Sequence, residues 1–338
     1  MKNARINVPP GSEIIREYAD YTKLWDRSVK NLYFSLPYCI LIKWRKFLKY
    51  HERICNMSEE KKCSGNCESC SSKEKENCAL NETLGKIKHK IVVMSGKGGV
   101  GKSTVSVNLA YSLALAGFRV GLLDVDVHGP SIPKMLHLEK KELEAAGNGK
   151  IMPHEVAGLK VMSIGFMLEN TDDPVVWRGP MKIGVIQQLF TEVEWGELDY
   201  MVVDCPPGTG DEPLTVCQTV KDKGGSAVIV TTPQQVASSD VSKSVNFCKQ
   251  MQFPITGLIE NMSGFVCPKC GEITDIFASG GGEKLAASYG ITFLGKLPID
   301  PEVCKGGDEG KPFAYYRSET PVGKAFAAAV EKVEETLQ

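Results

Sequence analysis

A glycine-rich stretch with two lysines is the part of this sequence best suited to chemistry. Residues 94–104 read MSGKGGVGKST, and the segment from Gly96 to Ser103 meets the pattern G-x-x-x-x-G-K-[ST]. The backbone N–H groups of such a loop wrap around phosphate groups, and the helix that follows adds a favourable dipole. In this pattern Lys102 reaches the β- and γ-phosphates, and the hydroxyl of Ser103 binds Mg²⁺. The sequence therefore predicts a site for a nucleotide and its magnesium ion.

Three aspartates stand where such chemistry needs carboxylates. Asp124 ends the apolar stretch Arg119–Asp124, Asp126 follows it, and Asp204 ends the stretch Tyr200–Asp204. Ligands of an open α/β sheet bind at the carboxyl ends of its strands, so all three carboxylates are expected near the glycine-rich loop. The alternative for each aspartate is an ordinary role in a turn or a helix cap.

A close cysteine pair suggests a second kind of site. Cys267 and Cys270 flank two residues, but a site with four thiolate ligands needs two more cysteines. A two-fold dimer would supply them, one pair from each subunit. Clustered cysteines in a chain without a clear secretory signal favour metal or iron–sulfur ligation over disulfides. The segment CPKCG also looks like one knuckle of a zinc ribbon, so zinc and an unligated redox pair stay open.

An N-terminal cysteine group is a further candidate ligand set. Its members are separated by three, two and seven residues, and they are Cys63, Cys67, Cys70 and Cys78. A second iron–sulfur cluster, a zinc site or metal-scavenging tail, and a tail without metal are the three interpretations. The isolated cysteines are expected to be small core or loop residues instead; they are Cys39, Cys205, Cys217, Cys248 and Cys304.

The elements that must position these residues alternate between strand-like and helical patterns. The expected strands are Ile91–Met94, Arg119–Asp124, Leu159–Ile164, Tyr200–Asp204, Ser226–Thr231, Thr256–Ile259 and Ile291–Leu294. The expected helices are Val105–Ala116, Lys182–Phe190 and Ser239–Gln250. Continuous apolar strands indicate a sheet that is covered on both faces, and the alternation with helices indicates an α/β fold with a mostly parallel sheet.

Composition divides the 338 residues into three parts. We expect an ATPase domain over 86–338 and a Cys-rich metal-binding tail over 57–85, with a polar linker from Ser71 to Lys90. Residues 1–56 are an extension with three open interpretations, namely an interfacial membrane helix, a poorly packed segment, or a start codon placed too early, with Met57 the true start. The 40 basic and 41 acidic residues nearly cancel, which predicts no strong attraction to nucleic acid or anionic membrane.

The second lysine of the loop points to a specific class. GKGGVGKST resembles the deviant phosphate-binding loop of the dimeric P-loop ATPases that include MinD, ParA and the nitrogenase iron protein. In that class the early lysine, here Lys97, crosses a dimer interface to the nucleotide of the partner subunit. The resemblance implies that hydrolysis depends on dimer formation, because a cation supplied by a second subunit neutralises transition-state charge only when the subunits meet. The alternative for Lys97 is a solvated loop lysine.

The same resemblance assigns roles to further residues. Asp126 would orient or deprotonate the attacking water, Asp124 would support the Mg²⁺ shell, and Asp204 is similar to the second magnesium aspartate. Asn261 resembles the adenine-reading asparagine, and Pro298 and Asp300 resemble a second base-contacting loop, although such residues are also common in turns. The implied ATP-binding loop comprises Gly96, Lys97, Gly98, Gly99, Val100, Gly101, Lys102, Ser103 and Thr104.

Four further segments narrow the class. VWRGPM at 176–181, CPPGTGD at 205–211, ENMSG at 260–264 and GGGEKL at 280–285 are similar to the Mrp-type iron–sulfur cluster carriers, over roughly residues 91 to 330. In that family the paired cysteines, here Cys267 and Cys270, hold a labile [4Fe–4S] cluster between two subunits for transfer to apo-proteins. Relatives of the Nbp type hold a second cluster near the N-terminus, but the gaps around their central C-x-x-C differ from those of this chain.

The resemblance therefore implies a cytoplasmic homodimer that uses ATP, Mg²⁺ and a [4Fe–4S] cluster and delivers the cluster to apo iron–sulfur proteins. No nucleic acid or membrane partner is expected. The competing interpretations are a zinc-stapled positioning ATPase of the MinD and ParA kind and a metal-insertion NTPase. A MinD-like protein should end in a membrane-binding helix, but the polar face of residues 324–338 is rich in glutamate, which does not suit anionic lipid.

Overall fold

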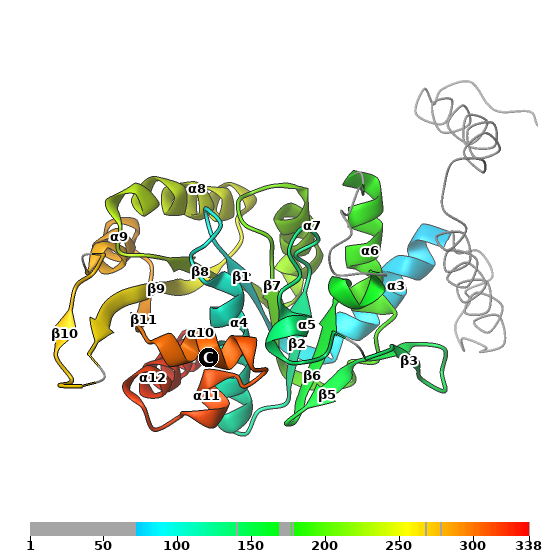
Figure 1. Ribbon diagram of the computed structural model, residues 1–338. Helices are drawn as coiled ribbons and strands as arrows, with labels where there is room; N and C mark the ends of the chain where they lie inside the picture. The colour runs from blue at the N-terminus through cyan, green and yellow to red at the C-terminus, as the bar shows by residue number, and fades with distance from the viewer. Residues whose placement is uncertain are drawn as a thin grey trace, which may run out of the picture. The chain divides into compact units, whose positions relative to one another are not determined.

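Figure 1 shows the computed structural model, which describes residues 72–139, 141–168, 177, 179–267, 269–277 and 279–337. The interpretations offered for residues 1–56 and for Cys63, Cys67 and Cys70 lie outside the described residues. Among the described residues, no helix combines the length and the apolar character that crossing a bilayer requires.

A mostly parallel sheet forms the centre of the fold, as the sequence predicts. Its strand order is β10-β9-β8-β1-β7-β2-β6-β5, and β11 also pairs with β9. The parallel strands are β1 (Ile87–Met94), β2 (Val120–Asp124), β6 (Leu159–Ser163), β7 (Leu198–Asp204), β8 (Gly225–Thr231), β9 (Ile255–Val266) and β11 (Phe293–Ile299). β5 (His154–Val156) and β10 (Ile273–Thr274) are antiparallel additions, and β3 (Glu144–Ala145) pairs with β4 (Ile151–Met152) in a separate ribbon.

Helices cover both faces of the sheet (Figure 1). One face carries α4 (Lys102–Leu115), α11 (Phe313–Tyr316) and α12 (Pro321–Leu337). The other face carries α3 (Ser72–Gly85), α6 (Gly179–Thr191), α7 (Asp211–Val220), α8 (Gln235–Met251) and α9 (Gly281–Tyr289). Short helices α5 (Ile132–Met135) and α10 (Pro301–Asp308) contact each other, and the 3₁₀ turns are η2 (Ile164–Met167) and η3 (Lys221–Lys223).

Strand β1 shows why continuous apolar stretches form this sheet. Ile91 and Val93 lie in the core beneath α4 and α12, whereas Val92 and Met94 lie in the core on the opposite face. Successive side chains of a strand point to opposite faces, so a strand that is covered on both sides needs apolar residues at every position. Buried strands of this kind place the glycine-rich loop at the carboxyl edge of the sheet.

The prediction of a polar linker between Ser71 and Lys90 is wrong. Residues 72–85 form helix α3, and β1 already begins at Ile87. Thr83 and Leu84 are buried, and Leu84 belongs to the core on the α6 side of the sheet. The polar composition of α3 concealed this contribution, because few of its residues are apolar, although Leu80 and Leu84 both pack against the core.

Candidate functional site

The glycine-rich loop connects β1 to α4 and is shaped by residues with positive φ. Gly99 has a φ of 78° and Gly101 a φ of 77°, which favour glycine because other side chains rarely adopt this conformation. At Gly101 a side chain is also excluded by space, since a Cβ atom there would lie 2.4 Å from Nδ2 of Asn261. The next residue, Lys102, begins α4, so the loop delivers its backbone N–H groups and the helix dipole to one place.

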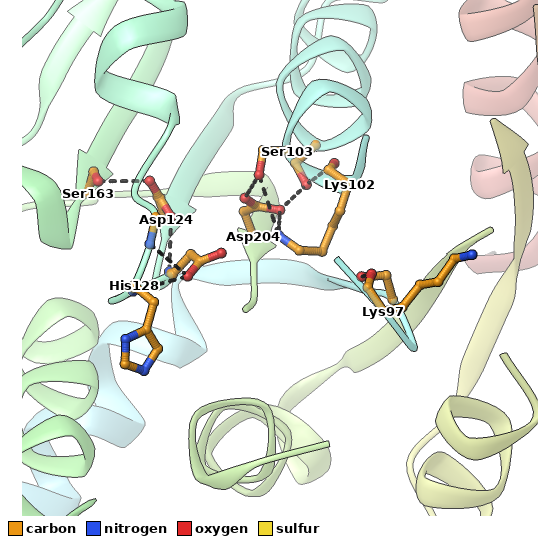
Figure 2. A network of polar contacts seen from close by, with 11 residues as sticks. Lys97, Lys102, Ser103, Asp124, His128, Ser163 and Asp204 are labelled. Atoms are coloured by element: carbon orange, nitrogen blue, oxygen red, sulfur yellow. Dashed lines mark hydrogen bonds and ion pairs between the residues drawn. The ribbon is translucent and has the colours of Figure 1, made fainter. Parts of the chain in front are cut away.

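Asp204 is the centre of the hydrogen-bond network beneath the loop (Figure 2). Its Oδ1 accepts hydrogen bonds from Lys102 Nζ and from Ser106 Oγ, each at 2.7 Å. Its Oδ2 accepts from Ser103 Oγ at 2.6 Å. β7 runs parallel to β1 and ends at Asp204, and this arrangement brings the aspartate to the start of α4. Ser106 was not predicted from the sequence, although it lies one helical turn after Lys102.

A second acidic group lies on the next strand. Asp124 ends β2, is paired in register with Asp204, and accepts hydrogen bonds from Ser163 Oγ at 2.9 Å and from the backbone N–H of Asp126 at 3.0 Å. Asp126 in turn accepts hydrogen bonds from the backbone N–H groups of His128 and Gly129, each at 3.2 Å. These bonds fix the orientation of the Asp126 carboxylate at the edge of the loop.

The charges at this edge do not balance. Asp124, Asp126 and Asp204 are all buried, and Lys102 is the buried ammonium beside them. Burial and the charge of Asp204 raise the pKa of Asp124. Burial also opposes the charge of Lys102, but the charge and hydrogen bond of Asp204 outweigh this and raise the Lys102 pKa. Carboxylate and hydroxyl oxygens are ligands that Mg²⁺ prefers, so the donor set and the excess negative charge fit a magnesium ion.

A cavity of about 500 Å³ opens beside the loop. Its lining residues from the glycine-rich loop include Lys97, Lys102 and Ser103, and Asp126 also faces it. The opposite wall comes from α5 and α10 and from the residues around them, which were not predicted from the sequence as site residues: Ser131, Lys134, Met135, Val303, Cys304, Gly307 and Asp308. The volume and the loop suit a nucleotide, and the opposite wall combines apolar side chains such as Met135 and Val303 with the charged Lys134 and Asp308.

The two lysines of the loop point in different directions. Figure 2 shows the side chain of Lys97 extending away from the Lys102–Asp204 pair. Ser95 Oγ donates a hydrogen bond to the backbone carbonyl of Lys97 at 2.9 Å, which holds the main chain and leaves the side chain outside that network. The ammonium group of Lys102 thus lies against the buried Asp204 of its own chain, whereas the side chain of Lys97 extends away from the buried carboxylates.

The three residues expected to contact the base have defined contacts elsewhere. Asn261, on β9, donates a hydrogen bond from Nδ2 to the carbonyl oxygen of Val100 at 2.8 Å. Asp300 caps α10 by accepting a hydrogen bond from the backbone N–H of Glu302 at 2.9 Å. Pro298 belongs to β11. None of the three is among the described residues that line the cavity. Asp300 sets the start of α10, however, and residues of α10 do line the cavity.

Cys267 and Cys270 lie at the tip of a hairpin formed by β9 and β10. The backbone N–H of Cys267 donates to the carbonyl of Glu272, and the N–H of Gly271 donates to the carbonyl of Cys267, each at 2.9 Å. Gly271 has a φ of 75°, a conformation that favours glycine directly after the second cysteine. Hydrogen bonds from the backbone N–H groups of Cys270 and Lys269 and from the Cys270 side chain lower the pKa of Cys267. This tight turn therefore presents one thiol that ionises readily beside an exposed second thiol.

The hairpin by itself lacks a full set of metal ligands. Within the described residues, no three or more His, Cys, Asp or Glu side chains gather closely enough to hold a metal ion. Large apolar side chains near the cysteines are exposed, namely Ile273, Ile276 and Phe277. Of the other described cysteines, Cys205, Cys217 and Cys248 are buried and Cys78 and Cys304 are exposed. Burial raises the pKa of Cys217 and Cys248 to about 12, which suits core residues rather than thiolate ligands.

Comparisons with known proteins agree with this arrangement. Residues 86–334 match the family described as ParA: NUBPL iron-transfer P-loop NTPase. The chain is 48% identical over 285 residues to an iron-sulfur cluster carrier protein of Methanocaldococcus jannaschii, covering 80% of this chain and 98% of that protein. It is 50% identical over 235 residues to the cytosolic Fe-S cluster assembly factor CFD1 of Kluyveromyces lactis, covering 68% of this chain and 83% of that protein.

A solved structure gives the same result for the fold. The nucleotide-binding protein of Archaeoglobus fulgidus, solved in complex with ADP, is 42% identical in sequence and superposes with a TM-score of 0.63. The match covers 71% of this chain and 93% of that one.

Proposed function

Because the chain belongs to the family of NUBPL iron-transfer P-loop NTPases, we propose that it is an ATP-hydrolysing carrier that binds a labile [4Fe–4S] cluster between two subunits and passes it to apo-proteins. The observation that carries the proposal is the pair Cys267 and Cys270, of which Cys267 is partly exposed and Cys270 exposed. The pair is held in a tight turn directly after β9, the strand that carries Asn261 and its contact with the glycine-rich loop. Two closely spaced thiols in a fixed turn supply half of the four thiolates that a [4Fe–4S] cluster takes, which suits a cluster shared with a second copy.

The nucleotide chemistry follows from the buried network. Lys102 and the backbone of the glycine-rich loop bind the β- and γ-phosphates, with the Lys102 ammonium already oriented by Asp204. Asp126, whose carboxylate is fixed by two backbone N–H groups, orients the attacking water and accepts its proton. Ser103, Asp124 and Asp204 would hold Mg²⁺, which neutralises phosphate charge when it is bound.

Hydrolysis is proposed to need two subunits. The side chain of Lys97 extends away from the buried carboxylates of its own chain, which suits contact with nucleotide on a partner copy (Figure 2). A cation that arrives only on dimer formation stabilises transition-state charge only in the dimer. ATP turnover would then report whether the two subunits, and with them the two cysteine pairs, have come together.

The cargo site also needs two subunits. One chain supplies Cys267 and Cys270, and a [4Fe–4S] cluster takes four thiolates. The lowered pKa of Cys267 favours the thiolate form that binds iron. An exposed apolar surface of Ile273, Ile276 and Phe277 beside the cysteines suits burial against a second copy. Exposed cysteines at a hairpin tip suit a cluster that is to be handed over, with apo iron–sulfur proteins as the recipients.

We further propose a cytoplasmic location, since a relative from Kluyveromyces lactis carries the name of a cytosolic Fe-S cluster assembly factor. Thiolates that bind and release a labile cluster also need a reducing compartment, because oxidation would pair them as disulfides. The proposed partners are therefore a second copy of this chain and cytoplasmic apo-proteins.

Anaerobic reconstitution with iron and sulfide tests the carrier function. We expect the holo protein to be a dimer by light scattering, to contain iron rather than zinc, and to activate an apo acceptor such as an aconitase. The double variant Cys267→Ala/Cys270→Ala should lose cluster transfer but still bind ATP, because neither thiol lies in the cavity beside the glycine-rich loop. Glu272→Ala, which changes an exposed side chain of the same turn but keeps both thiols, is the matched control and should keep its iron.

Two results would overturn the carrier function. The first is transfer by the double variant at the rate of the wild-type protein, measured against free iron and sulfide. The second is zinc as the metal bound by the hairpin, which would favour a zinc-stapled positioning ATPase. A monomeric holo form with a complete cluster on the hairpin would contradict the dimer part of the proposal.

A further inference from the structure

A lysine outside the glycine-rich loop joins the two segments that follow Asp124 and Asp204. Lys182 Nζ donates a hydrogen bond to Glu212 Oε1 at 2.7 Å and lies 2.9 Å from His128 Nε2. The imidazole nitrogen of His128 lies 3.9 Å from the same Glu212 oxygen. Three elements thus meet at one ammonium group: the segment after β2, the first turn of α6, and the first turn of α7.

Each partner of Lys182 belongs to a segment that serves the nucleotide. His128 lies two residues after Asp126, and its backbone N–H donates to the Asp126 carboxylate at 3.2 Å. Glu212 is the second residue of α7, which begins directly after the loop 205–210 that follows Asp204. That loop contacts the phosphate-binding loop, because the backbone N–H of Gly208 donates to the carbonyl of Ser95 at 2.8 Å.

The Lys182–Glu212 pair is sheltered from solvent, unlike the surface ion pairs of the chain. The two side chains are 14% and 10% exposed, whereas those of Lys86 and Glu82, paired at 2.8 Å, are 47% and 71% exposed. Burial opposes ionisation of Glu212, but hydrogen bonds from Lys182 and from its own backbone, with the Lys182 charge, outweigh this and lower its pKa. A sheltered pair holds its geometry, since removing one partner leaves a charge without compensation.

We propose that Lys182 and Glu212 are positioning residues for ATP hydrolysis, which hold the segment carrying Asp126 and the loop after Asp204 in one mutual arrangement. Lys182 acts through His128, whose main chain orients the Asp126 carboxylate, and Glu212 anchors Lys182 to the start of α7. The inference rests on the proposed hydrolysis of ATP at the glycine-rich loop. Neither residue lines the nucleotide cavity, so the pair affects turnover rather than nucleotide binding.

The test compares turnover with nucleotide affinity in four purified full-length variants. Lys182→Ala should lower kcat for ATP at least tenfold, counted per ADP-binding site, while the Kd for ADP stays within twofold of the wild-type value. Lys182→Arg should recover most of the turnover, because a guanidinium still donates to Glu212. Glu212→Gln keeps an oxygen acceptor but removes the charge and should show an intermediate loss. Lys86→Ala removes a Lys–Glu pair of similar length, between Glu82 of α3 and the residue that follows the helix, and should have wild-type turnover.

A double variant distinguishes positioning from general stability. If the two residues act as one unit, Lys182→Ala/Glu212→Gln should turn over no more slowly than Lys182→Ala alone. The inference is overturned if Lys182→Ala has a kcat within twofold of wild type. It is also overturned if the losses of kcat in Lys182→Ala and Glu212→Gln multiply in the double variant while Lys182→Arg is as slow as Lys182→Ala. Absence of ATP hydrolysis by the wild-type protein would instead refute the proposed function. If Lys182→Ala fails to fold, Lys182→Arg and Glu212→Gln still decide the outcome by the same kcat and Kd criteria.

Discussion

The side-chain amide of Asn261 donates a hydrogen bond to the main-chain carbonyl of Val100 at 2.8 Å. This bond fastens β9 to the phosphate-binding loop, and the absence of a side chain at Gly101 allows the close approach. β9 continues from Asn261 to Val266 and leads directly into the turn of Cys267 and Cys270. An extended strand rises about 3.3 Å per residue, and Met262 and Gly264 depart from extended backbone, so at most about 20 Å separates the loop contact from the two thiols. The proposed nucleotide and cargo sites are thus connected through a single element.

Removal of this connection should weaken both sites. Asn261→Ala deletes one hydrogen bond, which contributes about 0.5–1.5 kcal/mol, so ATP affinity should fall roughly 2- to 10-fold. Any acceleration of cluster transfer by ATP should also diminish, since the loop no longer holds β9. Isothermal titration and acceptor activation measure the two effects. Asn148→Ala removes an exposed amide that pairs with Glu194 and is the control. Unchanged affinity together with unchanged ATP dependence would disprove the link.

Substitution of the two lysines of the loop should have different effects on ATP binding and hydrolysis. Lys102→Ala should abolish ATP binding and hydrolysis and destabilise the fold, because Asp204 is left buried without its ammonium partner. Lys97→Ala should keep ATP affinity within twofold but lower kcat by at least about tenfold, if the lysine acts across a dimer interface. Steady-state hydrolysis at several protein concentrations measures this. Lys141→Ala, at an exposed lysine outside the cavity, is the control. Wild-type turnover by Lys97→Ala would contradict the shared site.

Asp124 should make the nucleotide-free protein sensitive to pH. Its pKa is higher in the folded chain than in the unfolded chain, so its contribution to the free energy of unfolding is full below about pH 4 and is lost as the pH rises toward the raised value. Above neutral pH, Asp124→Asn should therefore raise the free energy of unfolding by on the order of 1–3 kcal/mol and the melting temperature by a few degrees. Both increases should be smaller at pH 5.

The same substitution should lower Mg²⁺-dependent ATP hydrolysis by at least about tenfold, because an amide is a poorer magnesium ligand than a carboxylate. Asn keeps the acceptor for the backbone N–H of Asp126, so the local turn is retained. Thermal melting without nucleotide at pH 5 and pH 8 measures the stability effect, with the exposed Asp222→Asn as control. An equal shift of the melting temperature at both pH values would rule out the titration of Asp124 as the cause.

Two N-terminal deletions should behave differently. Removal of residues 1–71 should leave the ATPase folded, whereas removal of residues 1–85 also deletes α3 and its buried Leu84. Burial of one leucine contributes about 1.5–3 kcal/mol, so the longer deletion should melt several degrees lower. Thermal melting and ATP turnover compare the two proteins, and equal melting temperatures would contradict a stabilising role for α3.

The shorter deletion also tests the N-terminal cysteines, because it removes Cys63, Cys67 and Cys70 and keeps α3. Iron per dimer should fall if that segment holds a second cluster. An unchanged iron content would mean that Cys267 and Cys270 hold all of it.

The sequence by itself predicted the features that depend on local patterns. The glycine-rich loop needs consecutive residues with particular backbone conformations, and these are visible in the order of amino acids. The aspartates were found because the alternation of strands and helices fixes which residues reach the carboxyl edge. Cys267 and Cys270 were found because only two residues separate them. The family resemblance rested on the same short segments, and the comparisons confirm it.

Only the tertiary structure decided which of these segments touch. Lys102 and Asp204 are 102 residues apart, and Asn261 and Val100 are 161 apart, so their contacts depend on which strands are neighbours in the sheet. The same holds for Lys182, which meets Glu212 and His128 because α6 packs on α7, and for the cavity walls from α5 and α10. A hydrogen bond needs its atoms within about 3 Å, and periodicity along the chain determines which face a residue occupies but not what lies opposite it.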